Sequence, residues 1–234
     1  QRAPLRARFN TALARLQADA TLSRGDRVSA LIERVELARL GQPKDATQPL
    51  LPAALVQEVR EWSARMDREI SDPYERQAVI PAVAHLQGQA GLWADSDALL
   101  KANLARSHSP YYLMSQLGSN ARKLGRKDEA LRWYQRAFDQ SEGPATRLQW
   151  GSGYVSALVD LAPADAARIE KAGARLFGEA GQDKGAFHER SAKALQRVGR
   201  KLGSWAADGK HAAAMKRLQA QLDGLCARVD AADG

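Results

Sequence analysis

The chain has 234 residues, of which 44% are hydrophobic and 26% are charged, so it is long enough to bury a core as one large helical domain or two small ones. Its formal net charge of +8 permits binding to nucleic acid or to an anionic surface. The basic residues are scattered beside acidic neighbours without interleaved aromatic residues, however, which favours a solvated basic surface over a nucleic-acid site. No apolar run approaches the roughly 20 residues of a membrane span.

Residue usage predicts an all-α fold. Alanine, leucine, arginine, glutamine and glutamate are abundant, whereas isoleucine, valine and aromatic residues are few, and this bias favours helix over strand. No run of alternating apolar and polar residues is long enough to predict a strand.

The N-terminal part of the chain predicts three helices, at residues 4–18, 26–40 and 52–70. Apolar residues recur in them every three or four positions, for example Leu5, Phe9, Leu13 and Leu16 in the first helix. The polar, proline-bearing segment 42–51 between the second and third helices is predicted to be a loop or an internal hinge.

A fourth helix is predicted at residues 74–89. Asp72, directly before Pro73, is an N-cap signal, because its carboxylate can accept hydrogen bonds from the free amides of the first helical turn. Pro81 lies inside this helix and lacks an amide hydrogen, so we expect a kink there.

The most regular stretch is 111–144, YYLMSQLGSNARKLGRKDEALRWYQRAFDQSEGP, which predicts two amphipathic helices joined by a tight turn at Gly125. Small residues at Gly118 and Ala130 would let the helix backbones approach. The spacing of small and apolar residues resembles a tetratricopeptide (TPR) repeat, which implies a superhelical array of antiparallel helix pairs. The positions that carry this resemblance are Leu117, Gly118, Ala121, Ala130, Tyr134, Ala137 and Phe138.

The same 34-residue register extends to both sides of this stretch. One repeat earlier, the register places Gly91 at the position of Gly125, Ser96 at that of Ala130 and Asn103 at that of Ala137, so small residues are kept where the backbones cross. Pro110 and Pro144 fall at the same point of successive repeats, and each is expected to end a unit. A third, degenerate unit follows, with Leu148, Gly151, Ser152 and Val155 in its first helix and a second helix at 165–178.

Two further helices, at 186–206 and 210–227, follow the loop 181–185 and are predicted to cap the array. We therefore expect one helical domain over residues 1–234. It would comprise irregular helices at 1–72, TPR-like repeats at 73–180 and a capping helix pair at 186–228.

No catalytic residue, metal site or cofactor is predicted. The four histidines have no second ligand at metal spacing: His85, His108, His188 and His211. The segment 151–153 forms no phosphate loop, because it lies inside a helical pattern without a preceding strand. Asp95 and Asp97 are predicted to be solvated carboxylates at exposed helix positions. Cys226, the only cysteine, is predicted to be a small hydrophobic residue of the last helix, with pairing outside the chain as the alternative.

The functional feature that remains is a surface. In TPR arrays the first helix of each pair lines a concave face that binds extended peptides or partner helices. The register places the following candidates there: His85, Tyr112, Ser115, Ser119, Arg122, Lys123 and Gln149, with Gln89, Thr146 and Ser156 beside them. Arg122 with Lys123 would receive a carboxylate. The alternative is that these are ordinary polar surface residues.

A further resemblance covers most of the chain. The segments RVELARLGQP, DPYERQAVIPAVAHL, LLKANLARSHSPYYLMSQL, GPATRLQWGSGYVSALVDLAP and AQLDGLCARV are similar to the C-terminal helical region of proteobacterial thioredoxin-family proteins. Those proteins carry an N-terminal thioredoxin fold with a CxxC motif and are usually periplasmic. The resemblance implies that this chain, which has no CxxC motif, is the accessory part of a thiol-disulfide oxidoreductase. Since the chain opens at Gln1 without methionine, we expect a processed protein or a piece of a longer one.

Three functions therefore remain open. The favoured one is a non-catalytic scaffold that binds a polypeptide partner or client protein. The second is a free-standing basic helical protein that binds nucleic acid or an anionic surface. The third is a dimerisation module that forms a homo-oligomer through the end helices around Trp205 and Met215.

Overall fold

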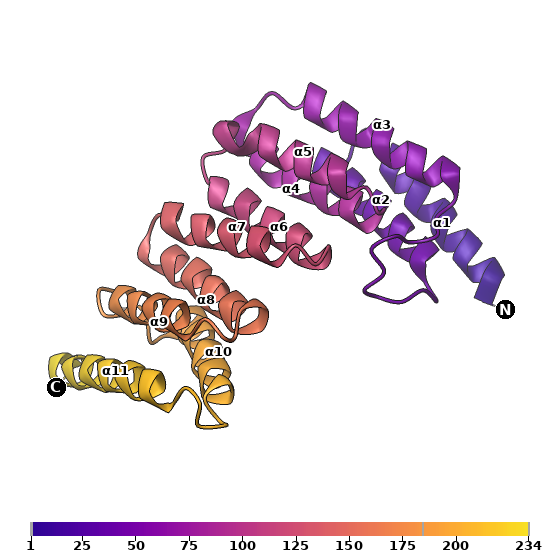
Figure 1. Cartoon of the computed structure of the whole chain (residues 1–234). Helices are drawn as coiled ribbons and strands as arrows, with labels where there is room; N and C mark the ends of the chain where they lie inside the picture. Colours follow the sequence, from indigo (N-terminus) through magenta and orange to yellow (C-terminus); the bar gives the residue numbers. More distant parts are fainter. Residues whose placement is uncertain (1, 184, 234) are drawn as a thin grey trace. The chain divides into compact units, whose positions relative to one another are not determined.

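The computed structural model describes residues 2–183 and 185–233, and the side chains of residues 4–183 and 185–228 (Figure 1). Every regular element in these ranges is a helix, which confirms the predicted all-α class. The α helices are α1 (Arg2–Ala18), α2 (Arg24–Arg39), α3 (Ala53–Glu69), α4 (Pro73–Gln89), α5 (Trp93–Asn103), α6 (Pro110–Lys123), α7 (Lys127–Gln140), α8 (Pro144–Leu161), α9 (Ala166–Ala180), α10 (Glu189–Trp205) and α11 (Ala212–Asp233), with the 3-10 turn η1 (Leu104–Arg106) after α5.

The chain forms two compact units, unit 1 (Gln1–Arg126) and unit 2 (Lys127–Gly234). The boundary follows the turn at Gly125, so the two helices of the most regular predicted repeat, α6 and α7, belong to different units. The predicted organisation as one domain with segments 1–72, 73–180 and 186–228 stays a prediction.

In unit 1, α4 occupies the centre, because it packs against α2, α3, α5 and α6. Asp72 caps its first turn as predicted, since the Asp72 carboxylate accepts a hydrogen bond from the Glu75 amide at 2.7 Å. The helix continues through Pro81 without a break. The Pro81 carbonyl accepts a hydrogen bond from Gln116 Nε2 of α6 at 2.9 Å, which ties two first helices together.

The segment between α2 and α3 is a loop, and it is fixed to its surroundings. The Gln42 side-chain amide donates to the Leu50 carbonyl and accepts from the Leu50 amide, both at 2.8 Å. The indole of Trp93 on α5 donates to the Thr47 carbonyl at 2.6 Å. These bonds close the loop and anchor it to α5, which favours a loop over a hinge.

In unit 2, α8 is the central helix and packs against α7, α9 and α10, while α11 packs against α9. Gly151 on α8 permits a close approach of its neighbours. A β-carbon at this position would lie 2.9 Å from both the Phe138 ring of α7 and Leu176 Cδ1 of α9. Phe138 and Leu176 are fully buried in the core of this unit. Gly151 is thus the small residue that the repeat pattern requires.

Local geometry confirms the 34-residue register. Gly91 and Gly125 both adopt positive φ, 79° and 72°, which side chains other than glycine rarely adopt. The small residues at the two helix-crossing positions are buried in each case: Ser96 and Ala130, Asn103 and Ala137. Pro110 and Pro144 are each the first residue of a helix, α6 and α8.

Several predictions are wrong in detail. Asp97 is buried rather than solvated, because its carboxylate accepts hydrogen bonds from Asn120 Nδ2 at 3.0 Å and from Arg126 Nη2 at 2.9 Å. Cys226 lies on α11 as expected, but it is exposed. The helix predicted from residue 186 begins at Glu189.

The first helix is correctly predicted, but its apolar face is not a core face. Leu13 is buried, whereas Leu5, Phe9 and Leu16 are 64%, 57% and 48% exposed. Helical spacing predicts that residues share a side, and a neighbour must still cover that side to bury them. In the described structure α1 packs mainly on α2.

Candidate functional site

Five of the seven predicted site residues lie on one side of α6. Their spacing of three or four residues, with one adjacent pair, places them on the same side of the helix, and all are exposed or half-exposed. They are Tyr112, Ser115, Ser119, Arg122 and Lys123. The opposite side of α6 is buried through Leu113, Met114, Leu117 and Ala121. We call the exposed sides of α4, α6 and α8 the first-helix faces.

The tyrosine and serines of this face are already organised. The Tyr112 ring is 45% exposed and lies 5.2 Å from the Tyr111 ring, centroid to centroid. Ser119 Oγ donates to the Ser115 carbonyl at 3.1 Å. The face therefore presents an aromatic ring at one end of α6 and two cations at the other.

His85 lies on the first-helix face of α4 and is exposed. Desolvation by the surrounding helices is the main cause that lowers the pKa of His85; Glu36 opposes it and Arg39 adds to it. Arg39 of α2 also donates to the Gln89 carbonyl at 2.9 Å. At neutral pH His85 is thus an uncharged hydrogen-bonding group next to a fixed guanidinium.

Gln149 and Ser156 lie on the first-helix face of α8, where α10 approaches. Gln149 Oε1 accepts a hydrogen bond from Arg190 Nη2 at 2.8 Å. Ser156 lines a cavity of about 1050 Å³ between α8, α10 and the turn that follows α10. In unit 2, the predicted face is therefore one wall of a groove, and α10 forms the other wall.

The sequence analysis did not assign the basic residues of α10 to a site. The available signal was their recurrence every three or four residues, at Arg190, Lys193, Arg197, Arg200 and Lys201. It was missed because the two walls of the groove come from helices about 40 residues apart in the sequence.

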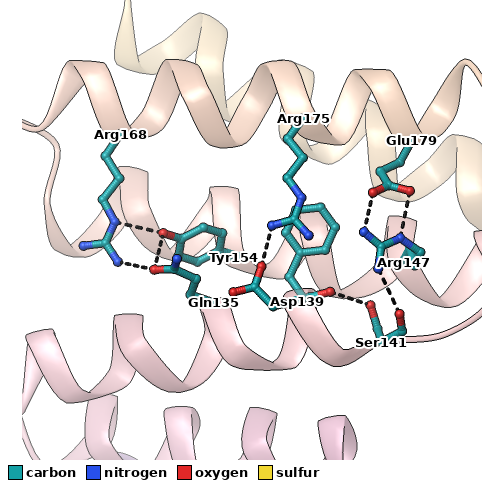
Figure 2. A network of polar contacts seen from close by, with 9 residues as sticks. Gln135, Asp139, Ser141, Arg147, Tyr154, Arg168, Arg175 and Glu179 are labelled. Carbon is teal, nitrogen blue, oxygen red and sulfur yellow. Dashed lines mark hydrogen bonds and ion pairs between the residues drawn. The ribbon is translucent and has the colours of Figure 1, made fainter.

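Helices α7, α8 and α9 of unit 2 are joined by polar contacts that serve packing (Figure 2). Arg147 donates from Nε to Glu179 at 2.8 Å and from Nη1 to the Ser141 carbonyl at 3.0 Å. The hydrogen bond from Arg147 lowers the pKa of Glu179. Figure 2 also shows Arg168 of α9 reaching Gln135 and Tyr154, at 3.0 and 2.8 Å.

These residues bond to one another across α7, α8 and α9, so the network fixes the helices of unit 2. Among the described residues, no group of three His, Cys, Asp or Glu side chains could hold a metal ion. None of the helices described is both long and apolar enough to cross a membrane.

The structure places the predicted residues in separate units. Those on α4 and α6 belong to unit 1, and Gln149 belongs to unit 2. Within α6 the five residues share a side, and within unit 2 Gln149 and Ser156 both face α10. A single surface that includes all seven stays a prediction.

Comparison with known proteins bears on the fold. The sequence matches no protein-family profile and no curated protein. The crystal structure of BtubC (BKLC) from P. vanneervenii is similar over 98% of this chain and 89% of that one, with a TM-score of 0.55 and 16% identity. The Q17M crystal structure of a putative kinesin light chain from Podosopora anserina, with nearly identical TPR-like repeats, is similar over 89% of this chain and 99% of that one, with a TM-score of 0.51 and 13% identity.

The chain has a TPR-like helical-repeat fold. This confirms the architecture expected from the 34-residue register.

Proposed function

We propose that the chain is a non-catalytic scaffold that binds a polypeptide partner through its first-helix faces. One observation carries the proposal. On α6, the side that packs into unit 1 is apolar and buried, while the other side is a continuous line of polar and aromatic residues from Tyr112 to Lys123. Such a line offers hydrogen-bond donors, acceptors and charge to an extended chain without rearrangement of the core.

A peptide selection tests this proposal. A display library of random peptides is selected on the immobilised wild-type chain, and the enriched peptides are then bound to two variants. Arg122→Glu/Lys123→Glu changes the first-helix face of α6, and Arg132→Glu/Lys171→Glu makes the same charge change at exposed positions of α7 and α9. We expect enriched peptides that lose affinity for the first variant and keep it for the second. Enrichment of no peptide contradicts the proposal, and equal binding of all enriched peptides to both variants overturns the role of the α6 face.

We further propose that this scaffold is the accessory C-terminal part of a periplasmic thioredoxin-like oxidoreductase. Its support is the resemblance of the five segments quoted above. Sequencing of the coding region upstream of Gln1 tests this proposal. A thioredoxin-type segment with a CxxC motif in the same reading frame is expected, and a reading frame that lacks one rejects the thioredoxin association but leaves the scaffold proposal intact.

A further inference from the structure

The groove in unit 2 between α8 and α10 has one basic wall. α10 carries Arg190, Lys193, Arg197, Arg200 and Lys201, and its only acidic residue is Glu189 at the first position. The five cations recur at intervals that place them on one side of the helix. The other side is buried through Ala194, Val198, Leu202 and Trp205. The basic residues therefore point away from the core along the length of the helix.

Two of the lysines that line the cavity are already paired with carboxylates. Lys201 Nζ pairs with Asp160 of α8 at 2.7 Å, and Lys210 Nζ pairs with Asp208 at 2.8 Å. Within the described part of the chain, no carboxylate lies within ion-pair distance of Arg197 or Arg200, and both side chains are exposed at the cavity. Arginine presents its donors in a planar fork that matches a carboxylate, so these two guanidinium groups form an anion-binding pair.

Part of the remaining cavity wall is apolar and fixed. Val159, Pro163 and Ala164 line it at the end of α8. The Trp205 indole donates to the Pro163 carbonyl at 2.8 Å and its ring stacks on His211, with the centroids 4.0 Å apart and an interplanar angle of 8°. Because Trp205 is 9% exposed and already stacked, it forms a rigid floor rather than a free platform for another ring.

We propose that this groove binds an extended, acidic peptide segment, with carboxylates on Arg197 and Arg200 and small apolar side chains against Val159 and Pro163. This inference rests on the proposed scaffold function and assigns the chemistry of its partner. The α10 residues that line the cavity, from Arg197 to Trp205, span about 12 Å along the helix axis, a length that about four residues of an extended peptide cover. Ser156 and Ser204 line the same cavity and supply hydroxyl groups for the peptide backbone.

The acidic residues of the cavity favour a peptide over a nucleic acid. Asp160 and Asp208 both line it, and each would lie near a continuous phosphate backbone that carries a negative charge at every nucleotide. A peptide with acidic residues at alternate positions leaves neutral side chains at these two sites. In addition, the Trp205 ring is 9% exposed and already stacks on His211, so it is not free to stack on a base.

Titration of the full chain with a defined peptide tests the inference. The probe is an end-blocked peptide of alternating glutamate and alanine, about eight residues long so that it exceeds the groove, with a neutral dye for fluorescence polarisation. Three comparisons accompany it: the same peptide with glutamine for glutamate, an oligothymidylate of equal charge, and the variant pair Arg197→Gln/Arg200→Gln and Arg132→Gln/Lys171→Gln. Both variants remove two exposed cations from unit 2, but only the first removes them from the groove.

We expect the acidic peptide to bind and the glutamine peptide not to bind. Loss of the two arginines should weaken binding by about tenfold or more at low salt, because it removes two charge-assisted contacts; loss of Arg132 and Lys171 should change it little. Equal weakening by both variants would mean that net charge alone attracts the peptide and would overturn the site. Tighter, arginine-dependent binding of the oligothymidylate would overturn the peptide assignment.

The failure of this inference is distinguishable from failure of the scaffold proposal. If the acidic peptide does not bind but the peptide selection yields ligands that depend on Arg122 and Lys123, the groove assignment is wrong and the scaffold proposal stands. If the selection yields no ligand and the acidic peptide does not bind, both are wrong.

Discussion

Substitution of Gly151 by alanine should destabilise unit 2 through overpacking. The new β-carbon would lie 2.9 Å from Leu176 Cδ1 and from two atoms of the Phe138 ring. Ordinary carbon–carbon contacts are about 3.5–4.0 Å, so both side chains must move by roughly 0.6 Å or more. The ring has little room to retreat, because the Arg175 and Arg147 guanidinium groups lie 4.1 and 5.5 Å from its centroid.

The expected magnitude follows from a matched control on the same helix. Overpacking of a buried site costs about 1–3 kcal/mol, while alanine in place of glycine improves helix propensity by about 1 kcal/mol. Gly153 lies two residues further on α8 and is exposed, and a β-carbon added there would meet no neighbouring atom within 4 Å. Gly153→Ala should therefore stabilise the chain. The propensity gain cancels in the comparison, so Gly151→Ala should be less stable than Gly153→Ala by about 1–3 kcal/mol.

Urea unfolding followed by circular dichroism measures this difference, with the transition of unit 2 identified by hydrogen exchange of α8. The double variant Gly151→Ala/Phe138→Leu should be more stable than the sum of the two single effects, because the smaller side chain makes room for the methyl group. Equal midpoints for Gly151→Ala and Gly153→Ala, together with additive double-variant energies, would refute the packing argument.

Three other predictions concern backbone conformation and titration. Gly125→Ala should lower the free energy of unfolding by about 1 kcal/mol because of the positive φ alone. Gly91→Ala should lower it more, since its β-carbon would also lie 3.0 Å from Pro49 Cδ. Thermal unfolding measures both losses, and equal losses would contradict this ranking. Glu179→Gln should destabilise unit 2 by about 1–3 kcal/mol at pH 7. The folded-state pKa of Glu179 lies below its usual 4.5, so the extra stability of the wild type should be lost as the pH falls from 4.5 through the lowered pKa. A stability difference between the two proteins that stays constant down to about pH 2 would contradict the ion pair. NMR titration should give His85 a pKa below 6.5, because desolvation disfavours its charged form. A pKa above 6.5 would show that the attraction of Glu36 outweighs desolvation.

The local features of the fold could be predicted from the sequence because they depend on nearby residues. The start of α4 at Pro73, capped by Asp72, follows from proline and carboxylate chemistry at the first helical turn. The register placed Gly91 at the position of the turn glycine Gly125, and in the structure both adopt positive φ although the surrounding residues differ. Such features need no knowledge of which helices pack together.

Burial and site composition could not be predicted in the same way, because they depend on distant partners. Asp97 is buried only because Asn120 and Arg126 supply donors more than 20 residues away. Leu5 and Phe9 have the spacing of core residues, but no described helix covers them. Arg197 and Arg200 become a candidate site only once α10 lies against the end of α8.

The most direct test of the scaffold proposal is site-specific photo-crosslinking in a whole-cell extract of the source organism. A photoreactive amino acid is placed at Ser115 or Gln149 on the first-helix faces, or at Arg132 or Lys171 on the second helices, all of which are at least partly exposed. Mass spectrometry then identifies what each position captures. The scaffold proposal predicts polypeptide adducts at Ser115 and Gln149 that are absent at Arg132 and Lys171. Adducts at all four positions alike, or at none of them, would contradict it.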